Sequence, residues 1–260
     1  MGHDRIGFLP KTTSWKTIVK SLEPATFGTD ADFSALAART LEQVRERFLG
    51  LHKDAGVQAA LGFLVAISRS DEATTNSRAA PDIQLPSSLS PLRLSVALND
   101  WVDAHAQSQE YAEIAKRAAA ETLTSWHSLQ TRQAGLFADG PEDLTMKAWA
   151  TASSGAGFSE VSRVFLARFT ERYLRYFLER EASAAIKSID ARDRFSDRLH
   201  HSLELVSRHA FETSKIAQSF AAGWFNKHAR EQTPNNAKLS SFLRVAFSKM
   251  REELRREASS

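Results

Sequence analysis

The stretch from Phe158 to Glu231 contains no proline and a single glycine, Gly223. Its large apolar residues recur every three or four positions, which is the spacing of one face of an α-helix. Proline and glycine are the residues that most often end a helix, so a stretch of this length nearly free of them predicts two long helices. We therefore expect the second half of the chain to be helical.

The first of these helices has two distinct faces. Phe165, Phe169, Tyr173 and the pair Tyr176/Phe177 follow one another at helical spacing. Rings aligned in this way require a partner surface, and we expect them to form a core face.

A second face of the same helix is rich in arginine. Arg168, Arg172, Arg175 and Glu179 share it, and Glu171 precedes Arg175 by one turn, the order that favours an ion pair. One interpretation is a solvated face with ion pairs. The other is a binding stripe for phosphate groups or for an acidic partner.

The remaining segments show the same period, and no run of alternating β-branched residues is present. The predicted fold class is all-α, a multi-helix globular bundle of about eight helices with no significant sheet and a core built mainly from 158–230. Gly157 is expected to be the N-cap of the first long helix, and Gly62 to mark a close approach of two helices. Helices are predicted at 11–23, 30–50, 57–67, 92–106, 109–133, around Met146 and Trp149, from Phe158, at about 195–229 and from Lys238.

Residues 70–91 carry Ser, Thr, Asn and three prolines without periodicity, so they are the best candidate for a long loop. This loop predicts an N-terminal helical part at 1–80, an acidic helical part at 81–157 and a long-helix part at 158–260. One continuous domain is the alternative.

The charge balance is nearly even, with 34 basic and 31 acidic residues and a formal net charge of +3. Its distribution is uneven. Residues 81–157 carry 5 basic and 9 acidic side chains, whereas 158–260 carry 19 and 13. The C-terminal part is therefore the side expected to face an anion.

Cysteine is absent from the chain, which excludes disulfides, thiolate zinc sites and thiol nucleophiles. No run approaches the ~20 apolar residues of a membrane span, and the opening MGHDRIGFLP lacks the apolar core of a signal peptide. These features predict a cytoplasmic protein with no membrane contact.

Titratable residues are densest on the second long helix, at His200, His201, Glu204, Arg208, His209 and Glu212. One helix presents too few ligands for a metal ion, and no Glu-x-x-His or His-Glu-x-x-His motif occurs. We expect no metal and no cofactor, and we interpret the cluster as a surface ion-pair network. An enzyme site around His200, Glu204 and His209 is the remaining alternative.

The last helix places Leu239, Phe242, Leu243, Ala246, Phe247, Met250 and Leu254 on one face. An apolar face of this length must dock, either on the chain's own core, which we favour, or on a partner protein through Phe242, Phe247 and Met250. Arg251, Arg255 and Arg256 lie elsewhere on the same helix. Together with Arg168, Arg172 and Arg175 they are the candidate residues for binding nucleic acid or an acidic partner.

The segments SGAGFSE, RFTERYLRYFLEREASAA and RHAFETSKIAQSFAAGWFNKHA, with the opening GHDRIGFLP, resemble uncharacterised bacterial all-helical accessory proteins of multi-gene antiviral defence operons. The resemblance implies an accessory subunit and transfers no functional residue. With no catalytic motif in the sequence, we expect a non-enzymatic subunit or adaptor of a cytoplasmic bacterial complex, plausibly in antiviral defence, that acts through helix-face contacts with other protein subunits. A nucleic-acid-binding helical module that uses an arginine-rich face is the alternative.

Overall fold

The computed structural model describes residues 9–22, 30–69, 83–106, 109–134, 140–212 and 215–257. Within these ranges the regular elements are all helices, and no strand occurs. The predicted all-α fold class is confirmed. The side chains at 30–34, 109–110, 133–134, 141–143, 203, 206–212, 215–218 and 257 lie outside the described part.

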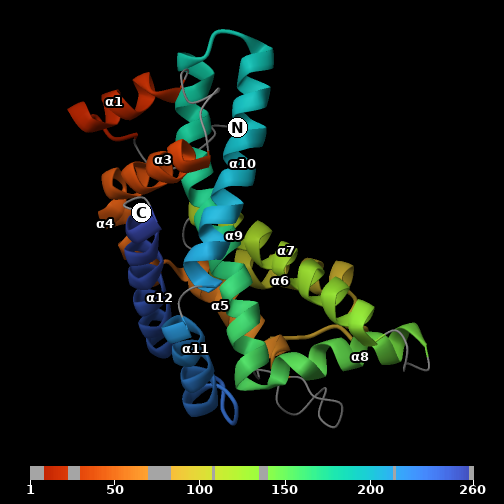
Figure 1. Cartoon of the computed structure of the whole chain (residues 1–260). Helices are drawn as coiled ribbons and strands as arrows, with labels where there is room; N and C mark the ends of the chain where they lie inside the picture. The colour runs from red at the N-terminus through yellow and green to blue at the C-terminus, as the bar shows by residue number, and fades with distance from the viewer. Residues whose placement is uncertain are drawn as a thin grey trace.

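Helix α9 (Gly155–Ala185) runs through the middle of the molecule, as Figure 1 shows. Helix α10 (Ile189–Glu212) follows after a short connection and packs antiparallel along it. Helix α7 (Gln109–Ala134) packs on another side of α9. Phe165, Phe169, Tyr173 and Phe177 of α9 are fully buried, which confirms the predicted core face.

Helix α5 (Ala55–Ile67) forms the base of the core and is buried along almost its whole length. It packs against α6 (Pro91–His105) and α7, and Trp101 of α6 donates its Nε1–H to the Ala59 carbonyl at 3.1 Å. A close approach of two helices lies at Gly56, where a Cβ atom would come within 2.8 Å of Ala112 Cβ in α7. At Gly62 the corresponding contact, with Leu239, is an ordinary 3.4 Å, so the tight approach on α5 lies six residues earlier than predicted.

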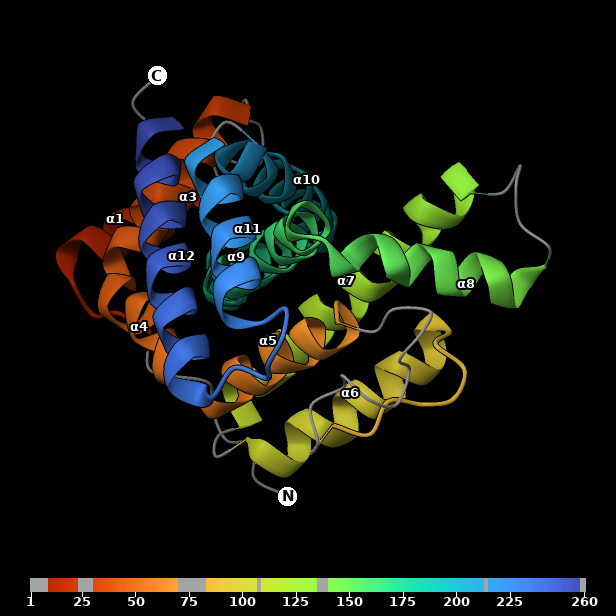
Figure 2. The same cartoon turned by 90° about the horizontal axis from the view of Figure 1, so that it is seen from below.

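Helices from the N-terminal and the C-terminal parts of the chain pack together on one side of the bundle. Helices α1 (Thr13–Lys20), α3 (Asp30–Gln43) and α4 (Arg45–Gly50) and the 3-10 turn η1 (Leu51–Lys53) come from the N-terminal part. Helices α11 (Lys215–His228) and α12 (Asn236–Glu257) come from the C-terminal part, and Figure 2 shows α12 beside α3 and α4.

Helix α8 (Pro141–Ala150) and the 3-10 turn η2 (Thr151–Ser153) lead into α9. Two buried indoles hold this corner. Trp126 donates its Nε1–H to the Ala148 carbonyl at 2.9 Å, and Trp149 donates to the Leu89 carbonyl at 2.8 Å. Leu89 belongs to the predicted loop 70–91, of which the described residues 83–90 are non-helical and anchored in this way.

Three local predictions need correction. The described residues form eleven α-helices rather than about eight. The predicted helices at 30–50 and 195–229 are each divided: the first into α3 and α4 at Val44, and the second into α10 and α11. The N-cap of α9 is Ser154 and not Gly157, since the Ser154 hydroxyl accepts the Gly157 N–H at 2.9 Å.

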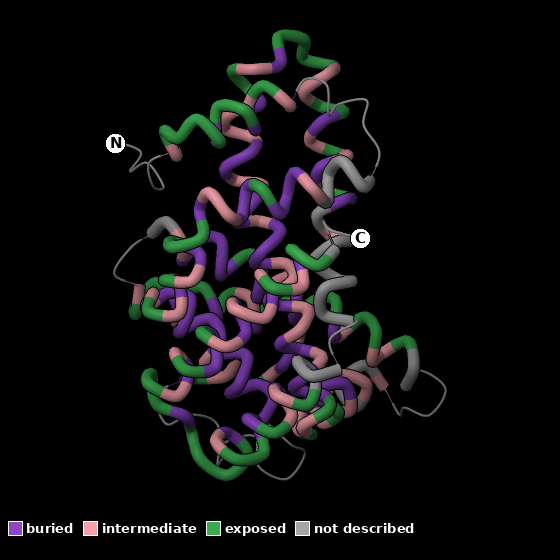
Figure 3. The backbone as a smooth tube through the Cα atoms, turned by 60° about the vertical axis from the view of Figure 1, so that its left-hand side comes forward, coloured by how far each residue is buried: buried purple, intermediate pink, exposed green. Residues whose placement is uncertain are grey.

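The buried apolar residues of the described ranges form one core cluster, and Figure 3 shows the buried positions in purple along the backbone. It draws residues from all three predicted parts, 1–80, 81–157 and 158–260. The core is therefore wider than the 158–230 segment that was expected to dominate it, because α5, α7 and α12 contribute a large share. None of the described helices combines the length and the apolar character needed to cross a membrane.

Candidate functional site

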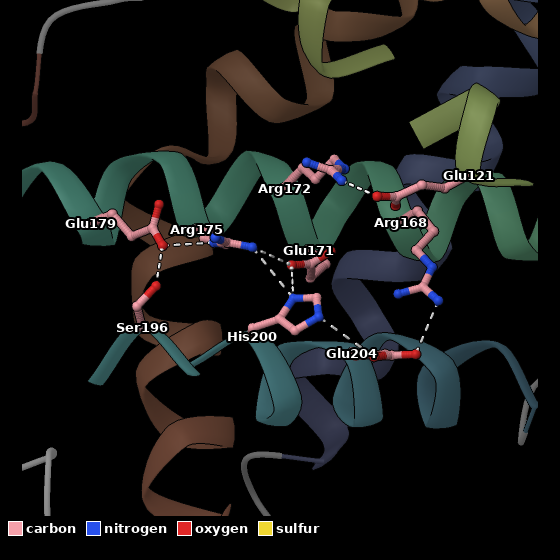
Figure 4. A network of polar contacts seen from close by, with 9 residues as sticks. All are labelled: Glu121, Arg168, Glu171, Arg172, Arg175, Glu179, Ser196, His200 and Glu204. Atoms are coloured by element: carbon pink, nitrogen blue, oxygen red, sulfur yellow. Dashed lines mark hydrogen bonds and ion pairs between the residues drawn. The ribbon is translucent and has the colours of Figure 1, made fainter. Parts of the chain in front are cut away.

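The arginine-rich face of α9 lies between two other helices, and Figure 4 shows its polar contacts. Arg172 pairs with Glu121 of α7, and Arg168 Nη2 lies 3.1 Å from Glu204 Oε1 of α10. Arginines paired across helices in this way tie α7 and α10 to α9. Most of the arginines on this face therefore form ion pairs between helices, and few of their charges are left for a bound anion.

Glu171 is the most buried charged residue of this network, with a side chain only 2% exposed. His200 of α10 places its Nδ1 atom 2.9 Å from Glu171 Oε1. A carboxylate oxygen accepts hydrogen bonds, so this contact is a hydrogen bond in the tautomer with the proton on Nδ1. Arg175 also approaches Glu171, at 3.8 Å, in the predicted one-turn ion pair.

Arg175 makes its shorter contact with a different glutamate. Its Nε atom lies 2.7 Å from Glu179 Oε1, and Ser196 Oγ of α10 donates to the same oxygen at 2.7 Å. Burial disfavours the charged guanidinium, but the hydrogen bond to Glu179 and the nearby carboxylates outweigh this effect and raise the pKa of Arg175. Arg175 therefore remains a fixed cation between α9 and α10.

Beside this network, a cleft opens over α9 between α7 and α10, with a volume of about 260 Å³. Its apolar surface comes from Trp126 and Leu129 of α7 and from Val164 and Ala167 of α9. Leu129 is 46% exposed, so part of this apolar lining is open to solvent. Charged side chains of both signs complete the lining: Glu160, Arg163, Arg168, Glu171 and Glu204.

No protein-family model, curated protein or solved structure matches this chain. Function is therefore inferred from the geometry of the described residues. The cleft is the candidate site, because it joins exposed apolar surface to a set of fixed charges.

The imidazole of His200 is nearly half exposed, at 45%. Its Nε2 atom faces Glu204 Oε2 at 3.9 Å, so two carboxylates flank the ring. In the described part, the ring's other polar neighbour is Arg175 at 3.4 Å. This is the geometry of an imidazole held in a fixed orientation, and with the carboxylates it could act as an acid–base pair. No hydroxyl nucleophile is among these neighbours, so the alternative of an enzyme site lacks a reacting group.

The other members of the predicted histidine cluster are not all placed. The side chains of Arg208 and His209 lie outside the described residues. Among the residues that are described, no group of three or more His, Asp or Glu side chains is arranged to hold a metal ion.

The candidate residues of the last helix divide into buried and charged positions. Phe242, Phe247 and Met250 are at most 2% exposed and pack inside the chain, as the favoured prediction of internal docking requires. Because α3, α10, α11 and η1 cover this face, the three side chains do not form a surface for a partner in this structure.

The three C-terminal arginines lie at a different helix junction from the α9 network. Arg251 Nε contacts Glu42 of α3 at 3.0 Å, and Arg255 Nε lies 3.7 Å from the same oxygen. Arg256 is 73% exposed and pairs with Glu253 at 3.0 Å. The six predicted arginines therefore do not form one continuous stripe.

Sequence reasoning missed Glu121, Glu42 and the apolar lining of the cleft. Glu121 lies 51 residues from Arg172 and Glu42 lies 209 residues from Arg251, so helical spacing gave no sign of either pair. The pair between Glu160 and Arg163 was visible as neighbours one turn apart. The exposure of Leu129 could not be predicted from the sequence, because an apolar residue on an amphipathic helix is normally assigned to the core.

Proposed function

We propose that this chain is a non-enzymatic adaptor that binds a partner protein in the cleft over α9. The observation that carries the proposal is the exposed side chain of Leu129 beside the apolar lining of that cleft. Contiguous apolar surface at a hollow is typical of a protein-binding site.

The size of the cleft favours a partner side chain over a small-molecule substrate. Its volume, about 260 Å³, is below the range of roughly 300–1,000 Å³ typical of small-molecule sites. A hollow of this size suits one or two bulky apolar anchors from an amphipathic helix of the partner.

The charges around the cleft support a specific orientation of that helix. The lining contains two ion pairs, Arg163 with Glu160 and Arg168 with Glu204, so a partner helix that binds here meets polar groups beside the apolar surface. The contacts of His200 and Arg172 hold α10 and α7 on either side of α9. A hollow with fixed walls costs little reorganisation on binding.

The cellular setting of this adaptor is part of the same proposal. The resemblance of the C-terminal half to accessory proteins of defence operons supports a subunit of a cytoplasmic bacterial complex, plausibly an antiviral one. The partner would then be another protein of the same operon.

Co-purification with two matched variants tests the adaptor function. The tagged chain is expressed in its native host as wild type, as Leu129→Arg and as Leu92→Arg, and retained proteins are identified by mass spectrometry. Leu92 is 76% exposed on α6, so it is an equivalent leucine outside the cleft. We expect one neighbouring-operon protein to be retained by wild type and by Leu92→Arg and lost from Leu129→Arg.

Two results would count against the adaptor. A wild-type chain that retains no operon protein contradicts it directly. A partner that stays bound to Leu129→Arg, with an unchanged melting temperature of the variant, removes the cleft as its binding site.

The alternative of a nucleic-acid-binding module draws less support from α9, because Arg168, Arg172 and Arg175 are each held by a glutamate. A gel-shift titration of a duplex and a single strand at two salt concentrations separates the two functions. Nucleic-acid binding requires an affinity that falls steeply with salt, since phosphate contacts release counterions.

A further inference from the structure

Helix α6 lies at the lower edge of the bundle in Figure 2 and exposes apolar side chains on its outer side. Leu92 is 76% exposed, the highest value for a large apolar side chain in the described part of the chain, and Val96, one turn later, is 55% exposed. On the opposite side of the helix, where α5 and α7 pack, Leu94, Leu98 and Val102 are fully buried. The two exposed side chains therefore form a small apolar patch on a peripheral helix.

Charged residues surround this patch in an unusual order. The outer face of α6 consists of five exposed residues that fall within about 100° around the helix axis, namely Leu92, Arg93, Val96, Asp100 and Asp103. Its cation stands in the first turn of the helix, and its two carboxylates stand in the second half. The helix dipole favours the reverse order, because the N-terminal end of a helix is positive. Within a single copy of the chain, this arrangement of charges is unfavourable for α6.

Two of these charges have no ion-pair partner in the described part of the chain. Asp103 accepts a contact from Lys116 of α7 at 2.8 Å, but neither Arg93 nor Asp100 is paired. Arg93 and Asp100 are seven residues apart, which is two turns and about 10 Å along the axis. They therefore lie on the same side of the helix, too far apart to pair with each other. Val96 lies midway between them.

We propose that the outer face of α6 binds the same face of a second copy of this chain. The two α6 helices form an antiparallel pair about a two-fold axis beside Val96. Such an axis turns the face end for end, so each Arg93 meets the Asp100 of the other copy and two ion pairs form. The two Val96 side chains pack against each other at the centre. Each helix end also lies beside the opposite end of the other dipole, which offsets the unfavourable order of charges.

Charge complementarity is the reason for choosing a second copy as the occupant. The face carries one unpaired cation and one unpaired carboxylate at equal distances from Val96, so its complement is the same face turned end for end. A parallel pair of helices would place Arg93 against Arg93 and Asp100 against Asp100, and like charges repel. The two charges therefore specify the antiparallel order as well as the partner.

The dimer is expected to be weak. Helix α6 has 15 residues, so one helix pair buries less than the roughly 1,200–2,000 Å² of stable complexes. We expect a dissociation constant of about 10–100 μM. Salt should weaken the dimer further, because exposed ion pairs are screened. The outer face of α6 shares no residue with the cleft over α9, so the dimer and the adaptor can each fail without the other.

Analytical ultracentrifugation of the full chain over a series of concentrations tests the dimer. Val96→Arg should weaken it at least tenfold, because two guanidinium groups would meet at the axis. Val96 is more than half exposed, so the melting temperature of this variant should match that of wild type. The control is Leu129→Arg, which changes an exposed leucine of the cleft over α9 and should alter the dissociation constant less than twofold.

Reversal of the two charges tests the antiparallel order. Arg93→Glu and Asp100→Lys should each weaken the dimer about tenfold, because each creates two contacts between like charges. The variant that carries both changes should return to within threefold of wild type, since opposite charges meet again. An equimolar mixture of the two single variants should also dimerise, because each supplies the charge that the other lacks.

Four outcomes would overturn the proposal. The first is a wild-type chain that stays monomeric at millimolar concentration. The second is a dimer that Val96→Arg and both single charge variants leave unchanged, which would place the contact on another face. The third is a double charge variant as weak as the single ones, which would exclude the antiparallel order. The fourth is a monomeric chain that loses an operon protein when Val96 is replaced, which would assign the outer face of α6 to a different protein.

Discussion

His200 Nδ1 lies 2.9 Å from Glu171 Oε1, so a ring that is nearly half exposed holds a carboxylate that is almost fully buried. A buried carboxylate without a partner is strongly disfavoured, because it has lost its hydration. The contact joins α10 to α9 and supports one wall of the cleft. It is the point at which the polar network most directly affects stability.

Replacement of His200 by alanine should therefore destabilise the protein by about 1–3 kcal/mol, the usual result of leaving a buried polar group unsatisfied. The matched control is His201→Ala, because His201 is the next residue of the same helix and is exposed. Urea denaturation of both variants measures the difference. Equal midpoints for the two variants would show that Glu171 does not depend on His200.

The aromatic face of α12 gives a second prediction. The ring of Phe247 lies 4.9 Å from that of Phe48 and 5.6 Å from that of Phe169, and the ring of Phe242 lies 4.8 Å from that of Trp224. Phe242→Ala and Phe247→Ala should each lower the free energy of unfolding by about 3–5 kcal/mol, the usual loss for a buried phenylalanine.

Ser241→Ala is the control for these two variants, because Ser241 is exposed on the same helix. We expect it to stay within about 0.5 kcal/mol of wild type. Thermal melts of the two phenylalanine variants that match wild type would show that α12 does not dock in the core.

The surroundings of two glycines predict opposite effects on stability when each glycine is replaced by alanine. A Cβ atom at Gly157 would lie 2.1 Å from the Thr151 carbonyl oxygen, whereas nothing lies within 4 Å of a Cβ at Gly223 in α11. Gly157→Ala should destabilise the protein by about 1–3 kcal/mol or more through overpacking. Gly223→Ala should stabilise it by up to about 1 kcal/mol, because alanine is the better helix former. Shifts of the melting temperature in the same direction would contradict this pair of predictions.

A half-buried histidine gives a pH-dependent prediction. Burial of His127, which lies 3.1 Å from Thr145 Oγ1, lowers its pKa in the folded protein. Below the ordinary value of 6.5 the unfolded chain therefore binds more protons than the folded one, so stability falls as the pH is lowered through this window. We expect the loss of stability between pH 7 and pH 5 to be smaller in His127→Gln than in wild type. Urea midpoints at the two pH values measure it, and identical losses would refute the assignment.

The sequence predicted the structure best where apolar residues recur at the spacing of a helix. The aromatic period of α9 and the apolar period of α12 identified buried faces, because a side chain at one position of a helix constrains the orientation of those one turn away. The same period was misleading at 195–229, which the structure describes as α10 and α11. The period of apolar residues also did not identify Ser154 as the N-cap of α9, because its capping role depends on the turn before that helix.

What the sequence by itself determined is the helical class and the core faces of the long helices, since both follow from the periodicity of apolar residues. Only the tertiary structure decided which charges meet. Arg175 pairs within α9, as its spacing from Glu171 and Glu179 indicates, whereas Glu204 and Glu121, the partners of Arg168 and Arg172, come from other helices. The convergence of Arg45, Arg251 and Arg255 on Glu42 likewise joins α12 to α3. The spacing of residues along a helix fixes the contacts within that helix. Contacts between helices depend on how the whole core packs, and the cleft over α9 is formed by contacts between helices.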